Sequence, residues 1–276
     1  MKRLLSIELY KVKHHKLSKI LFIAYFALLS SIALIASIKF TIGHTTIYLA
    51  DQGIFNFPYI WHFNTYTADF FTFFLAIIVV SMVTNEFGYR TVKQNLIDGM
   101  TKKEFVLSKF TFLVVLSLLA TAFVAIITLV LGWFYSDFTS FNSIVKEIYF
   151  LPAFFLKLLG IFSFIMLTGF IFKRSAFALG FFFIWMIIEG IIYLTLRVKI
   201  DKEIAAQVTG FFPYLSIKNL LPEPATRLSF AKNIGKQIGE KIDVFNGIPI
   251  QNYIIVIFWI TIFVFLSYYI LKKRDL

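Results

Sequence analysis

The sequence predicts an all-α integral membrane protein with six transmembrane helices, and three observations support this fold class. Of its 276 residues, 59% are hydrophobic and only 15% are charged, whereas about a quarter of a typical soluble domain is charged. Six long apolar runs each approach the roughly 20 residues that a helix needs to cross a bilayer. Much of the net charge of +12 lies in short segments beside these runs, as expected for cytosolic loops.

The N-terminal segment, residues 1–19, predicts a helix that lies on the membrane surface. Leu5, Leu9 and Val12 form one apolar stripe at helical spacing. The segment also carries six basic residues, which suit the anionic cytosolic leaflet, so membrane lipid is an expected partner: Lys2, Arg3, Lys11, Lys13, Lys16 and Lys19. A cleaved signal peptide fits poorly, because the apolar run that follows is too long and lacks a small-residue cleavage site.

The six spans follow in order, and the basic residues between them fix their orientation. We expect them at about 20–38, 67–84, 107–132, 151–172, 177–196 and 252–271. The N-terminal segment, the loop over 85–106, the turn at Lys173 and Arg174 and the C-terminal tail are all basic. The positive-inside rule therefore places both termini and this loop in the cytosol, as expected for a multi-pass protein of the bacterial inner membrane.

The loop over 85–106 predicts two helices in water between two spans. Tyr89, Val92 and Leu96 fall on one face of a short helix over 86–97. Gly99 suits a helix stop because glycine adopts the left-handed conformation at little cost. Thr101 and Glu104 then form a capping box, so a second helix begins here and runs without interruption into the next span.

This loop resembles the intracellular loop of ABC transporter permeases of the ABC-2 type. The resemblance rests on Asn85, Glu86, Phe87, Arg90, Thr91, Leu96, Gly99, Lys103, Phe105 and Lys109. It implies that the first helix is a coupling helix, which docks on a separate ABC ATPase subunit. The residues expected to take part are Glu86, Phe87, Tyr89, Arg90, Val92, Leu96, Gly99 and Lys103. We expect Phe87, Tyr89, Val92 and Leu96 to be the docking anchors, with Arg90 as a polar contact.

The last outer segment, 197–251, predicts a re-entrant hairpin before the final span. Asp201 to Val208 has a helical pattern, and the apolar pieces that follow are too short to cross the membrane. The resemblance implies that 211–221 closes the pathway toward the outside, with Phe211, Phe212, Pro213 and Leu215 as the extracellular gate. The more polar stretch 223–250 predicts a small extracellular cap without an assigned role.

Two further features concern the fourth and fifth spans. Lys157 and Glu189 lie at similar depth in adjacent antiparallel spans, so we expect an intramembrane ion pair. The alternative is that Lys157 extends alone toward the outer surface and that Glu189 is protonated. Ala176 and Gly180 form a small-xxx-small pair, a pattern that allows close helix approach, and indicate a dimer face. Ordinary packing within one subunit explains this pattern equally well.

The chain lacks the motifs of an enzyme. It has no phosphate-binding loop with the spacing of an ATPase, so ATP and Mg²⁺ are expected on the partner subunit and no cofactor in this chain. It has no cysteine, its four histidines are scattered, and no metal site is expected. The basic charge follows the membrane orientation, so a nucleic-acid partner is not expected.

The leading hypothesis is therefore the permease subunit of an ATP-driven exporter, paired with a second copy or a related permease. The alternatives are an ion-coupled secondary carrier or channel, which usually places several ionisable groups at mid-membrane, and a membrane-embedded enzyme. The sequence does not identify the substrate, the direction of transport or the pairing of the subunits.

Overall fold

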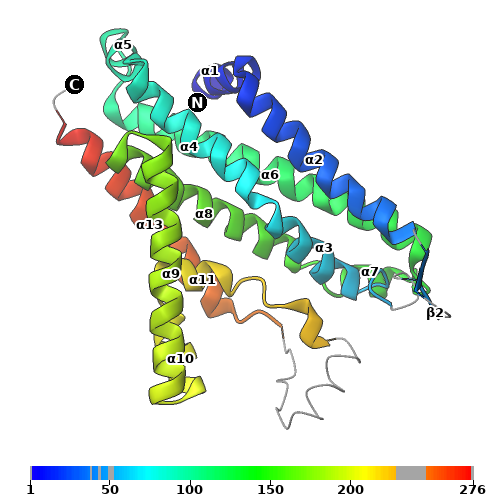
Figure 1. Ribbon diagram of the computed structural model, residues 1–276. Coiled ribbons are helices and arrows are strands. Elements are labelled where there is room, and N and C mark those ends of the chain that lie inside the picture. Colours follow the sequence, from blue (N-terminus) through cyan, green and yellow to red (C-terminus); the bar gives the residue numbers. More distant parts are fainter. Residues whose placement is uncertain (1, 38, 43–44, 49–52, 228–246, 275–276) are drawn as a thin grey trace.

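The computed structural model describes residues 2–37, 39–42, 45–48, 53–227 and 247–274. The chain folds into a bundle of long apolar helices joined by short helical connections (Figure 1). Its elements are α1 (Lys2–His14), α2 (Lys16–Ser37), β1 (Lys39–Ile42), β2 (Thr45–Tyr48), α3 (Tyr59–Phe70), α4 (Thr72–Gly88), α5 (Thr91–Ile97), α6 (Lys102–Tyr135), α7 (Phe141–Val145), α8 (Phe150–Phe172), α9 (Ser175–Lys199), α10 (Lys202–Thr209), α11 (Pro213–Lys218), the 3₁₀ turn η2 (Pro224–Arg227) and α13 (Ile250–Lys272).

The centre of the bundle is α8, which packs against α3, α4, α6, α9, α11 and α13. A helix that is apolar on all sides is suited to such a buried position. Glycines let neighbours approach it closely: a Cβ at Gly169 would lie 3.0 Å from Val83 of α4, and one at Gly160 would lie 3.0 Å from Ile217 of α11. These contacts place α8 at the core of the fold.

The second predicted span is longer than expected and is bent. α3 begins at Tyr59, and the chain breaks at Phe71 before α4, with an angle of 47° between the two helices. The third predicted span is part of a longer helix, as the capping box predicts, because α6 starts directly after the Thr101 cap and runs over 34 residues. A helix of that length spans about 50 Å, more than the hydrocarbon core requires.

The segment after α9 forms two short helices rather than a span. α10 packs back along α9, as the helical pattern over 201–208 predicts, and α11 sits against α8, α9 and α13. η2 is held to α3 by the Tyr59 hydroxyl, which donates to the Pro224 carbonyl at 2.8 Å, and to the α7–α8 turn by the Arg227–Glu147 ion pair. Burial lowers the pKa of Arg227, but Glu147 outweighs this and raises it. The predicted cap over 223–250 lies mostly outside the described residues, which leave out 228–246.

The two ends of the bundle differ in what they hold. α1, α5 and both chain termini gather at one end, whereas the short antiparallel hairpin of β1 and β2 and helix α7 lie at the other (Figure 1). The hairpin was not predicted. Lys102, at the start of α6, donates to the Lys272 and Arg274 carbonyls at 3.2 and 2.9 Å and fixes the end of α13 there. Both termini therefore share one end with the predicted coupling loop.

The long apolar helices confirm a multi-pass membrane protein. Among the described residues, four segments are long and apolar enough to cross a membrane, or five if the bent α3–α4 pair is one span: α6, Phe141–Phe172, α9 and α13 are the four. The first predicted span coincides with the helix α2. The count of six spans stays a prediction.

Candidate functional site

The loop over 85–106, here called the coupling loop, is built from two helical pieces before α6. α4 continues through Glu86 to Gly88, and α5 starts only at Thr91. Between them Arg90 adopts a left-handed conformation with φ 57°, which separates one helix from the next. The prediction of one helix over 86–97 is therefore wrong in its first part, because Glu86 and Phe87 belong to the end of the span.

The second half of the coupling loop agrees with the sequence. Gly99 has a positive φ of 91°, so glycine is needed at this helix stop. The Thr101 hydroxyl accepts from the Glu104 amide at 3.2 Å, and the Glu104 carboxylate accepts from the Thr101 amide at 2.9 Å. The predicted capping box is confirmed, and it joins the loop directly to the long helix α6.

The apolar face of α5 points into the protein. Val92 is 2% exposed, and Phe87 and Leu96 are partly buried against the core. The Phe87 ring meets the Phe170 ring of α8 edge-on, with centroids 5.9 Å apart. Val92 is therefore corrected from a docking anchor to internal packing, whereas Phe87 and Leu96 are only partly covered by the same chain.

The opposite face of the coupling loop is open. Tyr89 is 75% exposed and Ile97 is 68% exposed. Arg90, Lys93 and Lys103 of the same loop are exposed as well. This face combines an aromatic ring, an aliphatic side chain and basic groups, and we call it the Tyr89 face.

Four charged side chains meet under the coupling loop, and we call them the Glu86 cluster: Glu8, Lys11, Glu86 and Lys109. The Lys109 ammonium is fully buried and lies 2.6 Å from Glu86 Oε1 and 2.7 Å from Glu8 Oε2. Lys11 lies 2.7 Å from Glu86 Oε1. Two carboxylates and two ammonium groups balance in charge, as burial requires.

Glu86 also holds α5. Its Oε2 accepts from the Thr91 hydroxyl at 2.6 Å and from the Asn95 side-chain amide at 3.2 Å. Glu86 is 4% exposed, so it joins elements within the chain rather than offering an open surface. Through this one carboxylate, α1, α5 and α6 are tied to the end of α4.

The second notable site is a cavity of about 670 Å³ at the break between α3 and α4. We call it the α4–α9 cavity. Its other walls come from α8, α9 and α11. Phe73, Phe183 and Met186 make one side apolar, while Asp69 and Lys157 make the other polar. The Lys157 ammonium lies 2.8 Å from Asp69 Oδ2 and is almost fully buried.

The predicted ion pair between Lys157 and Glu189 is wrong. Lys157 pairs with Asp69 of α3, and Glu189 accepts from the backbone amides of Tyr214 and Leu215 at 3.0 and 2.8 Å. Glu189 also accepts from the Trp185 indole. The physical reason is that each charge finds a nearer partner, so Glu189 fixes α11 against α9.

Comparison with known families decides the class of protein. The profile of a family described as "ABC-2 family transporter protein" matches residues 4–189, more than half of the chain. The chain belongs to the ABC-2 transporter family. No curated protein matches it. The family match confirms the resemblance seen in the coupling loop. ABC-2 membrane domains are non-catalytic components, so membership implies a permease subunit with an ABC ATPase partner.

The matched region of this ABC-2 protein contains both sites almost completely. It runs from α1 through most of α9 and includes the Glu86 cluster, Asp69 and Lys157. α10, α11 and α13 lie beyond it. Membership favours the ATP-driven permease over the ion-coupled carrier that the sequence left open.

The residues of the predicted dimer face and of the predicted gate of this ABC-2 chain differ in exposure. Ala176 is exposed, and the space around Gly180 is open, with no atom of the described residues within 4 Å of a Cβ built there. Of the predicted gate, Phe211 is 64% exposed, Phe212 and Pro213 are half-buried, and Leu215 is buried. The dimer face and the gate stay predictions.

Sequence reasoning missed Glu8 and Asp69 as members of these sites. Asp69 lies two residues inside the predicted second span, and an acidic residue there was a signal for a partner on another span. Glu8 lies one helical turn before Val12 in a basic segment. No sequence spacing links Glu8 to residues 86 and 109, because the three come together only where α1, the end of α4 and α6 pack against one another.

Proposed function

We propose that this protein is the membrane-spanning permease subunit of an ATP-driven exporter, coupled to a separate ATPase subunit that binds ATP and Mg²⁺. The observation that carries the proposal is the exposed Tyr89 face, whose side chains stand on and beside α5, the short helix that buried charges tie to the spans. Interface hot spots favour aromatic and basic side chains of this kind. The proposed orientation places this face and both termini in the cytosol of a bacterial cell.

The Glu86 cluster supplies a route for coupling. A displacement of α5 acts on Glu86 through Thr91 and Asn95, and from there on α6 and α1 through Lys109 and Glu8. Removing one member of a buried ion pair costs about 3–5 kcal/mol, so these helices resist separate movement. A push on the loop therefore moves several helices together.

The α4–α9 cavity forms part of the translocation pathway in this proposal. A second copy or a related permease closes the pathway. In this proposal, export carries a solute through it past the 211–221 segment. The cavity has an apolar wall, and Asp69 Oδ1 is buried there without a hydrogen-bond partner among the described residues. A substrate group that donates a hydrogen bond satisfies this oxygen, because buried acceptors favour a partner.

The proposed docking is tested by purifying the permease in mild detergent with its ATPase. Tyr89→Ala combined with Ile97→Ala removes the two exposed apolar groups of the Tyr89 face. We expect at least a tenfold loss of co-purified ATPase, since hot-spot residues contribute about 2 kcal/mol or more. Both side chains are exposed, so the variant keeps its fold and its elution volume.

The matched control is Phe141→Ala with Ile250→Ala. These side chains are 81% and 76% exposed, and both lie away from the coupling loop. The control retains the ATPase if docking uses the Tyr89 face. Equal retention by both double variants contradicts this docking face, and loss in both indicates a general effect of removing surface apolar groups.

A further inference from the structure

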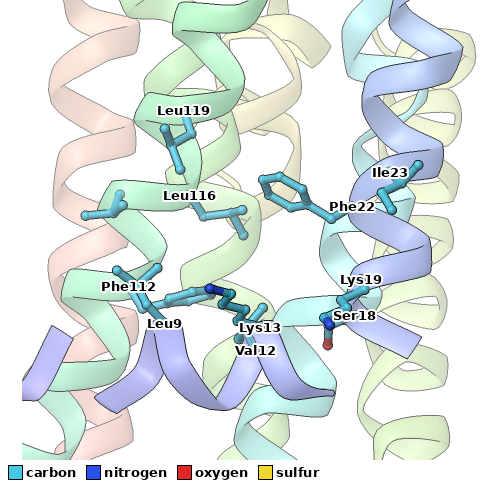
Figure 2. Close-up of a pocket in the computed structure, with 11 residues that line it drawn as sticks. Leu9, Val12, Lys13, Ser18, Lys19, Phe22, Ile23, Phe112, Leu116 and Leu119 are labelled. Carbon is cyan, nitrogen blue, oxygen red and sulfur yellow. The ribbon is translucent and has the colours of Figure 1, made fainter. Parts of the chain in front are cut away.

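A separate apolar groove lies where α1 turns into α2, and we call it the α1 groove. Its volume is about 260 Å³. Figure 2 shows α1 crossing one end of the groove, with α2 on one side and α6 on the other. Its lining comes from α1, the first turns of α2 and the middle of α6.

The groove has a buried floor and an open apolar rim. Phe112 and Leu116 of α6 are 2% and 3% exposed and form the floor. Ile23 and Leu119, at 67% and 48% exposed, form the rim farther from α1. The open side therefore faces the surroundings of the two long helices, where a membrane protein meets acyl chains.

Two unpaired lysines stand at the α1 end. Lys13 and Lys19 are exposed, and neither ammonium has an ion-pair partner among the residues that the structure describes. Lys11, two residues from Lys13, is by contrast paired with Glu86. The basic charge of this end of the groove is thus available to an anion.

We propose that the α1 groove binds an anionic phospholipid, with one acyl chain along Phe112 and Leu116 and the phosphate between Lys13 and Lys19. An interfacial basic helix attracts anionic headgroups, and the apolar channel beside it accepts the chain. Among the described residues, neither Lys13 nor Lys19 is held in an ion pair, and the hydroxyl of Ser18, the uncharged polar side chain of the lining, is already bonded to His15. The chemistry thus fits an amphiphile with a negative head.

The site has a structural consequence for α1. Glu8 and Lys11 hold one side of this helix in the Glu86 cluster, while Leu9 and Val12 line the groove on another side. A bound lipid then fixes α1 beside the cluster. This goes beyond the proposed function, since a lipid site is independent of whether an ATPase docks on the Tyr89 face.

The probe is phosphatidylglycerol added to the delipidated full-length protein, with phosphatidylcholine as the neutral comparison, and native mass spectrometry counts bound lipids. We expect one phosphatidylglycerol per chain to bind more tightly than phosphatidylcholine. Lys13→Gln with Lys19→Gln should weaken the binding of phosphatidylglycerol about 10-fold or more, because each of the two lysines attracts the anionic headgroup. The binding of phosphatidylcholine should stay unchanged. Leu119→Trp, which adds bulk at the rim, should weaken both lipids.

The matched control is Lys16→Gln, which removes one exposed charge from the same segment without touching the groove. It should retain most of the preference for phosphatidylglycerol. The proposal is overturned if the double variant binds phosphatidylglycerol like the unaltered protein, if Lys16→Gln loses as much as the double variant, or if Leu119→Trp changes nothing. Efficient crosslinking of Ile23→Cys to a second copy or to an ATPase in membranes also overturns it, since protein then covers the groove.

Discussion

α8 and α9 are adjacent apolar helices of similar length, yet the fold treats them in opposite ways. In the most apolar stretch of Phe141–Phe172, 78% of the residues are buried, against 17% in α9. Lipid tails are as apolar as leucine, so apolarity alone gives neither helix a reason to be central. The difference teaches that burial inside a membrane depends on which helix offers close contact and polar partners.

The glycines of the two helices make the difference concrete. The space beside Gly160 and Gly169 of α8 is occupied by Ile217 and Val83, respectively, each 3.0 Å from a Cβ built on the glycine. Around Gly180 and Gly190 of α9, a built Cβ meets no atom of the described residues within 4 Å. α8 has therefore used its small residues within the subunit, whereas those of α9 are available for another chain.

The largest expected effect on stability comes from removing Lys157, the charged residue of α8. Lys157→Met leaves the Asp69 carboxylate without its ammonium, which should cost about 3 kcal/mol of stability. Adding Asp69→Asn should restore most of the loss, because no charge is then stranded. Thermal unfolding of the two single variants and the double variant in detergent measures the coupling free energy.

A second double-mutant cycle tests whether Lys157 of α8 interacts with Glu189 of α9. Lys157→Met and Glu189→Gln should give additive losses, since Glu189 bonds to the start of α11 and not to Lys157. Strong coupling in this second cycle, or additivity in the first, reverses the assignment of partners.

These charges also mark how far the sequence could lead. The capping box at Thr101 was predictable because it joins residues three apart in the sequence, and the stop at Gly99 because glycine itself favours the left-handed conformation. The partner of Lys157 was not, because depth along two spans allows several pairings and packing selects one. Likewise, the stripe of Val92 and Leu96 predicted a buried face, but periodicity cannot tell whether the cover is the same chain or a partner.

A medium effect should distinguish the glycines of the two helices. Gly169→Leu forces a side chain against Val83 and should cost about 1–3 kcal/mol, the usual range for overpacking. Gly180→Leu projects into open space and should change the stability of the monomer by less than about 0.5 kcal/mol. Thermal unfolding under conditions that keep the chain monomeric compares them, and equal losses contradict the contrast between α8 and α9.

The smallest effect on stability, and the most direct test of the α9 face, comes from single cysteines in this cysteine-free chain. Ala176→Cys and Gly180→Cys should leave unfolding unchanged and form crosslinks between differently tagged copies in native membranes. Phe258→Cys on α13, where the side chain is 60% exposed, serves as a control and should not crosslink. Crosslinks from Phe258 alone place the dimer face on α13, and the open glycines of α9 then face lipid. Crosslinks from 176 and 180 instead explain why α9 keeps its small residues uncovered within one subunit, because a second copy fills the space that α8 fills for itself.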